Sequence, residues 1–221
     1  MCGRFARTSS RDSLAAEFGV AEFVNVDLRP RYNIAPSQGV EAIIRDGAEL
    51  RCGPMRWGFM ASAVASGVAP INARAETVGN IAMFRDAFRR RRCLVVADGF
   101  YEWRQDGGSR KIPHFIHLRS QRPFSFAGIW SSLRTSMGQR VGTCAILTCA
   151  PNELMAPIHN RMPVILASAA RGRWLDPQAS ESELQSLLVP LPAEQMEAWA
   201  VSVFVNSPRN DAPECVRRVE N

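Results

Sequence analysis

The sequence predicts an α+β fold with a curved, largely antiparallel β-sheet that is barrel-like and flanked by a few helices. Short apolar runs of strand length recur along the chain, whereas helical patterns are few. Two of these runs, 100–104 and 112–118, are separated by Asp-Gly-Gly-Ser-Arg at 106–110, which is typical of a hairpin turn. No repeat or linker divides the 221 residues, so we expect a single domain over 1–221.

The remaining elements follow from apolar patterning. Further strands are predicted at 40–45, 93–97, 124–130, 143–149 and 162–166. Helices are predicted at 10–18, 80–91, 168–174 and 180–188. Ser180 and Glu183 have the spacing of a capping box, which places the start of the last helix.

Composition and charge narrow the class of protein. Hydrophobic residues make up 46% of the chain, but no apolar run approaches the ~20 residues that cross a bilayer. The start of the chain lacks the pattern of a signal peptide, so we expect a cytoplasmic, nucleoid-associated protein without membrane contact. The net charge is +6, and Lys111 is the only lysine among the basic residues. Arginine suits bidentate phosphate contact, which favours a nucleic-acid partner.

The four arginines at 89–92 form the densest basic run. They follow an amphipathic helical pattern, so we interpret most of them as residues that complement the C-terminal end of that helix.

The cysteines and histidines do not predict a metal site or another cofactor. None of the six cysteines forms a C-x-x-C pair, and Cys93 and Cys144 sit in apolar runs as core residues. His114 and His117 lie three residues apart in a predicted strand. Their side chains would therefore point to opposite faces and could not meet at one metal ion.

The chain opens with Met1-Cys2-Gly3-Arg4-Phe5. Removal of Met1 would leave Cys2 with an α-amine, pKa about 7.7–8, and a thiol, pKa about 8.5, on one residue. Such a 1,2-aminothiol reacts with an aldehyde: the amine forms a Schiff base and the thiol then closes a thiazolidine. The alternative is that Cys2 has no special role.

Four segments carry a reactive or hydrogen-bonding residue two positions before an arginine. They are Cys2 and Arg4, Asn72 and Arg74, Glu102 and Arg104, and His159 and Arg161. In an extended backbone, residues i and i+2 share a face, so each segment would present chemistry beside phosphate affinity.

Glu102 and His159 are the candidate acid–base residues. Tyr101 and Trp103 flank Glu102 and would raise its pKa by removing the carboxyl from water. The alternative is an edge-strand glutamate that faces solvent or pairs with Arg104. His159 lies between two prolines in an irregular loop, where site residues are often held; a purely structural histidine is the alternative.

These residues lie in a pattern that resembles the SRAP (SOS response-associated peptidase) family. Seven blocks carry the resemblance, in order along most of the chain. They are MCGRF at 1–5, RYNIAPSQ at 31–38, RWGF at 56–59, PINARAET at 70–77, RRCLVVADGFYEW at 91–103, FAGIW at 126–130 and IHNRMPVIL at 158–166. Members of the family sense abasic sites in single-stranded DNA and crosslink to them through the N-terminal cysteine.

The resemblance implies a role for each site residue. Cys2 is the crosslinking nucleophile, Asn72 positions it and the opened sugar, and Glu102 transfers protons. His159 interacts with the sugar hydroxyl or stabilises the imine. The residues expected to contact DNA are Arg4, Arg74 and Arg161 as phosphate ligands, with Asn33 and Pro36 in the groove.

One departure from the family pattern concerns the segment after Trp57. Many members follow the W-G block with P-x-W or tandem tryptophans that contact bases, whereas here Met60 and small residues up to Ala65 follow. A stacked base contributes about 1–3 kcal/mol, so DNA affinity or junction preference would differ. Trp57 itself is expected in the core; the alternative is a position in the DNA groove.

Three functions therefore compete. The first is a monomeric abasic-site sensor that crosslinks to single-stranded DNA through Cys2, with β-elimination and strand cleavage as a competing outcome. The second is an N-terminal-nucleophile peptidase or amidohydrolase, which would need an oxyanion hole that no sequence feature identifies. The third is a non-catalytic binder of single-stranded nucleic acid.

Overall fold

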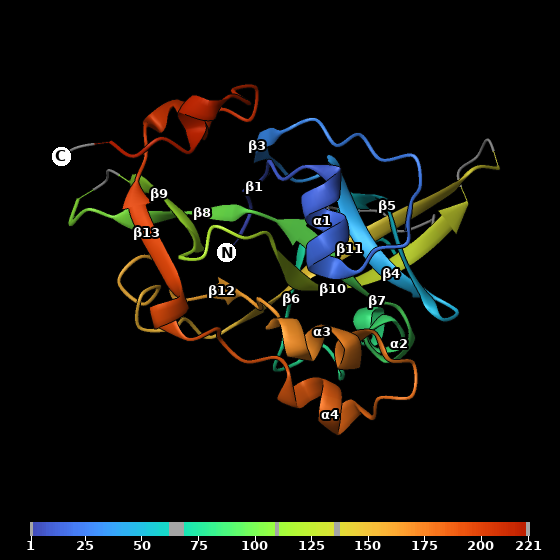
Figure 1. Ribbon diagram of the computed structural model, residues 1–221. Coiled ribbons are helices and arrows are strands. Elements are labelled where there is room, and N and C mark those ends of the chain that lie inside the picture. The colour runs from blue at the N-terminus through green and yellow to red at the C-terminus, as the bar shows by residue number, and fades with distance from the viewer. Residues whose placement is uncertain (1, 62–68, 109–110, 135–137, 220–221) are drawn as a thin grey trace.

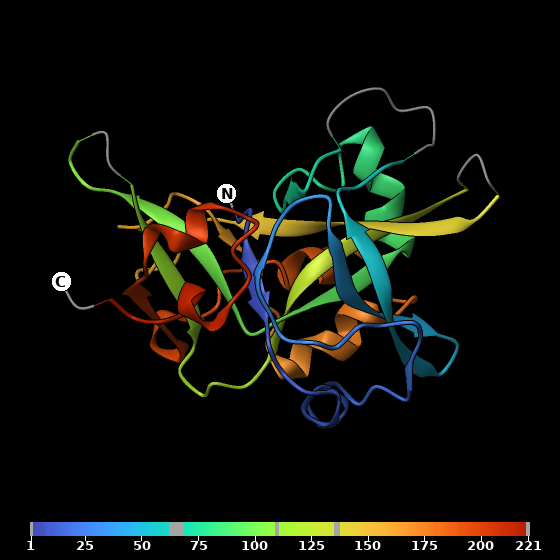
Figure 2. The same cartoon turned by 90° about the horizontal axis from the view of Figure 1, so that it is seen from above.

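In a computed structural model, which describes residues 2–61, 69–108, 111–134 and 138–219, the strands of the protein form two sheets that lie side by side. The helices lie around the larger sheet (Figures 1 and 2). The two predictions that concern Met1 and part of the segment after Trp57 fall on residues outside these ranges.

The larger sheet closes into a barrel of five strands. They are β4 (Gly39–Asp46), β5 (Glu49–Trp57), β7 (Arg92–Ala97), β10 (Phe124–Arg134) and β11 (Arg140–Cys149). Each pairs antiparallel with its neighbour in the order β11, β10, β7, β4 and β5, and β5 then pairs parallel to β11. Both faces of β7 are buried, because alternate side chains point into the barrel and the others lie beneath helices that contact this strand from outside.

Three short strands extend the barrel sheet. They are β2 (Glu22–Phe23), β6 (Asn72–Arg74) and β12 (Met162–Pro163). Both β6 and β12 pair with the C-terminal half of β11, β6 in parallel and β12 antiparallel. This end of β11 therefore brings segments from two distant parts of the chain together.

The second sheet has five strands in the order β13, β9, β8, β1 and β3. Their bounds are β1 (Phe5–Arg7), β3 (Arg31–Ile34), β8 (Gly99–Gln105), β9 (Lys111–Leu118) and β13 (Met196–Ala200). Beyond β13, the C-terminal part of the chain covers one face of this sheet through η2 (Val203–Asn206) and η3 (Pro213–Cys215).

Four α-helices and one further short turn complete the fold. They are α1 (Arg11–Phe18), α2 (Ala82–Arg90), α3 (Ser168–Leu175), α4 (Glu181–Ser186) and η1 (Ala193–Gln195). Helix α2 is amphipathic and buries Phe84 and Phe88. The predicted capping box of α4 is confirmed, because Ser180 and Glu183 cap each other's backbone N–H.

Strand β1 lies at the junction of the two sheets. Phe5 packs edge-on against two rings of the barrel, with centroids 5.1 Å from Trp57 and 5.7 Å from Phe126. Trp57 is fully buried, and its indole Nε1 donates to the carbonyl oxygen of Ile71 at 2.9 Å, which confirms it as a core residue. The start of the chain is thus held between the barrel and the second sheet.

The predicted fold class is confirmed: the protein is α+β, largely antiparallel, and contains a closed barrel. The predicted helices and most predicted strands are present. The expected strand at 162–166 is shorter, because only 162–163 pair with β11 and Ile165 makes an isolated bridge to Phe126.

Candidate active site

Cys2 lies just before β1, and its side chain is fully buried. Its carbonyl oxygen accepts a hydrogen bond from Nδ2 of Asn72 at 2.8 Å. Burial raises the pKa of the Cys2 thiol far above its usual range, and the negative charge of Glu102 raises it further. The thiol is therefore protonated at neutral pH and needs a base before it can act as a nucleophile.

Asn72 reaches Cys2 because β6 pairs with β11, where Asn72 lies opposite Ile146. Its amide nitrogen is committed to Cys2. Its Oδ1 atom is buried and has no hydrogen-bond partner among the described residues. A buried acceptor without a donor is costly, so Oδ1 is suited to an ammonium group or a hydroxyl beside Cys2.

Glu102 projects from β8 and is only 3% exposed. Burial raises the pKa of its carboxyl to about 7, and the positive charge of the chain's α-amino group partly opposes this. The expected burial is confirmed, and the solvent-facing alternative is wrong. However, Tyr101 and Trp103 are not the cause, because neighbours along a strand point to the opposite face.

His114 lies directly across from Glu102 on β9 and is buried on the same face. Sequence reasoning did not place it at the site. The sequence does predict the hairpin of β8 and β9. Pairing the two strands across that turn is the one step that could have placed His114 opposite Glu102.

His159 lies in the loop before β12 and is half-buried. Its Nδ1 accepts a hydrogen bond from the backbone N–H of Arg161 at 3.0 Å. Partial burial lowers the pKa of His159, and the α-amino charge lowers it further. The imidazole is therefore neutral at pH 7. Nδ1 also lies 3.2 Å from the Arg161 carbonyl oxygen, so its contacts fit either ring tautomer.

Arg74 and Arg161 come together at the end of β11. The Arg74 side chain is exposed on β6. Arg161 makes a two-pronged ion pair with Glu76, at 2.6 and 2.9 Å, and its Nη2 also donates to the carbonyl oxygen of Thr148 at 2.5 Å. Arg74 is thus open to a phosphate, whereas a phosphate at Arg161 would have to replace the Glu76 carboxylate.

Arg4 does not share a face with Cys2, and the expectation from their spacing is wrong. Cys2 and Gly3 precede β1, so the alternation of a strand does not apply to them. The Arg4 guanidinium lies on the face of Tyr101, where Nη1 donates to Asn33 Oδ1 and to the Val205 carbonyl oxygen, both at 2.8 Å.

Asn33 is fully buried, so its side chain supports Arg4 rather than reaching the surface. Its Nδ2 donates to carbonyl oxygens of the C-terminal segment, at Val205, Ser207 and Asn210. The carboxylate of Asp211 also accepts from the Asn33 backbone N–H at 3.0 Å, a contact that sequence reasoning missed. Pro36, by contrast, is exposed in the turn after β3.

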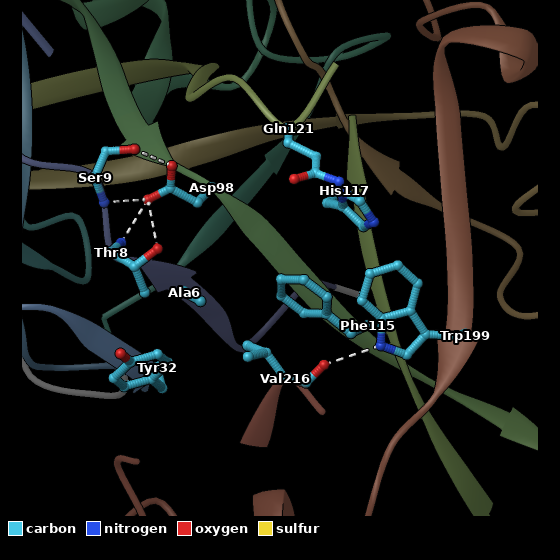
Figure 3. A pocket seen from close by; sticks show the side chains of 10 residues that line it. All are labelled: Ala6, Thr8, Ser9, Tyr32, Asp98, Phe115, His117, Gln121, Trp199 and Val216. Atoms are coloured by element: carbon cyan, nitrogen blue, oxygen red, sulfur yellow. Dashed lines mark hydrogen bonds between the residues drawn. The ribbon is translucent and has the colours of Figure 1, made fainter. Parts of the chain in front are cut away.

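A separate hollow of about 310 Å³ lies on the other face of the second sheet (Figure 3). Phe115 and Trp199 form one side of it, and His117 packs between them, which confirms that His114 and His117 point to opposite faces. Asp98, on the opposite side, accepts bonds from Thr8 and Ser9. This hollow is therefore separate from the site around Cys2.

The described residues contain no group of three or more His, Cys, Asp or Glu side chains that could hold a metal ion. All six cysteines are free and buried. No helix within the described ranges is long and apolar enough to cross a membrane.

The family model for SOS response associated peptidase (SRAP) matches residues 1–208, and the chain belongs to this family. The chain is similar to the abasic site processing protein YoqW of Bacillus subtilis, with 43% identity over 98% of this chain and 99% of the relative. It is also similar to the abasic site processing protein YoaM of the same organism, with 44% identity over 97% and 96%. A crystal structure of a protein from Bacteroides thetaiotaomicron has a TM-score of 0.88 and 28% identity over 99% of this chain and 100% of the other.

Proposed function

We propose that the protein processes abasic sites in single-stranded DNA by forming a covalent crosslink through Cys2. The relatives named abasic site processing proteins support the substrate. The observation that carries the mechanism is the 2.8 Å bond from Asn72 to Cys2, next to a carboxyl of Glu102 with a pKa of about 7. This arrangement holds the start of the chain against a proton-transfer group.

The proposed reaction begins after Met1 has been removed. The α-amine of Cys2 attacks C1′ of the ring-opened sugar, and loss of one water gives an imine. The sulfur then bonds to the imine carbon while the thiol proton moves to nitrogen, which closes a thiazolidine. The amine acts first because burial keeps the thiol protonated, whereas an α-amine titrates near 7.7–8.

Each polar neighbour supports one step of this reaction. With a pKa of about 7, Glu102 is present in both protonation states at neutral pH, so it can accept and return protons during ring opening and imine formation. His159, as a neutral imidazole, would hydrogen-bond to a sugar hydroxyl. Oδ1 of Asn72 would accept a hydrogen bond from the attacking α-amine or from a sugar hydroxyl.

The DNA backbone would lie along the arginines. Arg74 is exposed for a phosphate, Arg161 would exchange its bond with Glu76 for one, and Arg4 would act from the position that Asn33 gives it. Pro36 is on an exposed turn where a strand could pass. Single-stranded DNA suits this reaction because the lesion needs no extraction from a duplex.

The test is a denaturing gel with abasic and intact single-stranded oligonucleotides. We expect a shifted, denaturant-resistant band for the abasic strand alone, and its loss in Cys2→Ala and Cys2→Ser. Cys215→Ala removes another buried thiol and should retain the band. Peptide cleavage without DNA would favour the peptidase instead, and unchanged DNA binding without any covalent band in the wild type would favour a non-catalytic binder.

A further inference from the structure

A basic hollow of about 260 Å³ lies outside the Cys2 site, between the barrel and the C-terminal ends of α2 and α3. Its walls carry Arg45, Arg90 and Arg92 together with the side chain of Trp130. Apolar surface from Leu175 and Pro177 completes it, and no acidic residue lines it among the described residues. The hollow therefore joins cationic groups to an aromatic ring.

Arg92 is a buried cation in the wall of this hollow, only 5% exposed. Its guanidinium donates to backbone carbonyl oxygens at the ends of two helices, those of Phe88 and Arg89 in α2 and of Trp174 and Asp176 at the end of α3. These carbonyl oxygens lie at the negative ends of two helix dipoles and stabilise the Arg92 guanidinium. Arg92 therefore joins the two helices in the wall of the hollow, and the donors for a bound anion come from its other arginines.

The carboxylate of Asp176 acts on Arg92 electrostatically. Its oxygens, however, already accept hydrogen bonds from the Arg173 side chain and from the backbone N–H of Gln178. It therefore offsets part of the positive charge without filling the hollow.

Two further arginines keep donors available. Nε of Arg45 is buried and has no acceptor among the described residues, and Nη1 reaches only the Ala48 carbonyl oxygen at 3.4 Å. Arg90 is mostly exposed, with its nearest carboxylate, Asp86, at 3.6 Å. Asp86 also pairs with Arg91 at 2.6 Å, so one acid serves two guanidinium groups.

Helix α2 connects the hollow to the Cys2 site. A turn segment, 75–81, leads from Arg74 to this helix, and in it the Arg74 carbonyl oxygen accepts from Val78 N–H at 2.9 Å. The helix has 9 residues and is thus about 14 Å long. Arg85 and Arg89 are exposed along it, and Arg90 stands at its end beside the hollow. Arg89 is paired with Glu181 at 2.7 Å, so a phosphate there would have to replace that carboxylate. The path from one site to the other thus carries three arginine side chains.

We propose that this hollow is a second contact site for single-stranded nucleic acid. Arg45 and Arg90 bind a phosphodiester group, and Trp130 stacks on a base. The volume lies below the roughly 300–1,000 Å³ of sites that enclose a whole drug-sized ligand, and it suits one nucleotide of a longer strand. The inference rests on the proposed function, because it assumes that a strand held near Cys2 continues along α2.

The test uses intact single strands of about 6 and about 24 nucleotides, so that no crosslink contributes; the shorter length lies within the ~4–16 nucleotides of one binding groove. Fluorescence anisotropy at several salt concentrations compares the wild type with the double variant Arg45→Ala/Arg90→Ala. Arg217→Ala/Arg218→Ala is the matched control, because it removes two exposed charges from the C-terminal segment.

We expect the Arg45/Arg90 variant to bind the long strand at least fivefold more weakly, with a salt slope smaller by ~0.7 for each lost phosphate contact. The control pair should change neither. Trp130→Ala should give a similar loss, and Trp130→Phe should restore most of it, since both rings stack. The melting temperature of each variant shows whether it is folded. If the Trp130 variants unfold, the single variant Arg90→Ala still tests the proposal, because Arg90 is exposed.

Wild-type affinity and salt slope in Arg45→Ala/Arg90→Ala would overturn the proposal. Tight binding of inorganic triphosphate that abolishes strand binding at the hollow would also overturn the proposal. The hollow would then be a binding site for a free anion and not for a nucleic-acid strand. The proposed function fails separately, by the absence of any crosslink in the wild type. The arginine variants should still crosslink at the wild-type rate once DNA is saturating, because neither residue is near Cys2.

Discussion

Glu102 carries a carboxyl with a pKa of about 7, whereas an exposed glutamate titrates near ~4.3. The difference arises because the folded chain removes the carboxyl from water and thereby disfavours its charged form. The folded state consequently holds this proton more tightly than the unfolded state does. Ionisation of Glu102 therefore lowers the stability of the fold at the pH at which proton transfer is needed.

The first prediction concerns stability against pH. Below about 4.3, Glu102 is neutral in both states and has no effect; between about 4.3 and 7 the free energy of unfolding falls as the pH rises; above 7 the loss is constant. Glu102→Gln cannot ionise, so its stability relative to the wild type should increase across this window. Urea denaturation at pH 5 and pH 7.5 measures the free energy of unfolding of the variant and of the wild type. If the two proteins differ by the same amount at both pH values, the raised pKa is contradicted.

The second prediction concerns the rate of crosslinking. Glu102→Gln keeps the shape of the side chain but cannot exchange a proton, and acid–base groups typically contribute ~10²–10⁴-fold. We expect at least a tenfold slower single-turnover rate with nearly unchanged DNA affinity. His159→Ala should be milder, because water can replace a single donor. An unimpaired Glu102→Gln rate would assign the proton transfer to His159 or solvent.

The third prediction concerns Asn33, whose buried side-chain amide connects Arg4 to the C-terminal segment. Asn33→Ala leaves buried carbonyl oxygens without donors, at about 1–3 kcal/mol. DNA affinity should fall as well, since Arg4 loses the acceptor that holds it. Denaturation and anisotropy measure the two effects. Asn80→Ala, an exposed substitution, is the control, and a stable variant with weakened DNA binding would mean that Asn33 touches the strand itself.

At the scale of the elements, the long apolar strands could be predicted from sequence and the short polar ones could not. Strands β7 and β10 are continuous apolar runs, and the hairpin of β8 and β9 has a turn sequence. Strand β6 has only three residues, Asn72 to Arg74, and is a strand because β11 lies beside it. Such strands are determined by a distant partner rather than by their own pattern.

Strand β1 carries the fourth prediction. Arg7 is fully buried, pairs with Glu41 of β4 at 3.1 Å and donates to carbonyl oxygens of Asp27, Leu28 and Arg29. Arg7→Met leaves Glu41 buried without its cation, which typically costs about 3–5 kcal/mol. Calorimetry should show the loss, and Arg7→Met/Glu41→Gln should recover part of it. Full additivity of the two single substitutions would show that the pair is not coupled.

At the scale of the molecule, the barrel is packed so closely that one position, Gly128, has no space for a side chain. A Cβ atom at Gly128 of β10 would lie 2.7 Å from Cys93 Sγ and 3.1 Å from Val95 Cγ2. Gly128→Ala should therefore destabilise the fold by about 1–3 kcal/mol. Gly39→Ala of β4 is the control, because a Cβ there meets no described atom within 4 Å. Thermal unfolding compares the two, and equal melting temperatures would contradict the close packing of the barrel.

The candidate site was accessible from sequence only in part. Family resemblance pointed to Cys2 and Glu102, but the Glu102 carboxyl is buried because β8 lies between β9 and β1, and its aromatic neighbours in sequence point to the other face. The support of Arg4 could not, because Val205 lies 201 residues away and approaches only when the C-terminal segment folds over the second sheet. The link between Arg161 and Glu76 likewise depends on β11, which places β6 beside β12.

The central claim is that Cys2, as the mature first residue, bonds to the aldehyde of an abasic site. The most direct measurement is the intact mass of the protein after incubation with an abasic single-stranded oligonucleotide, without a reductant. We predict an adduct whose mass is that of the chain without Met1 plus the oligonucleotide minus one water, and its absence in Cys2→Ala. The corresponding adduct in Cys2→Ala, with the mass of that variant plus the oligonucleotide minus one water, would contradict the claim, as would an adduct that retains Met1.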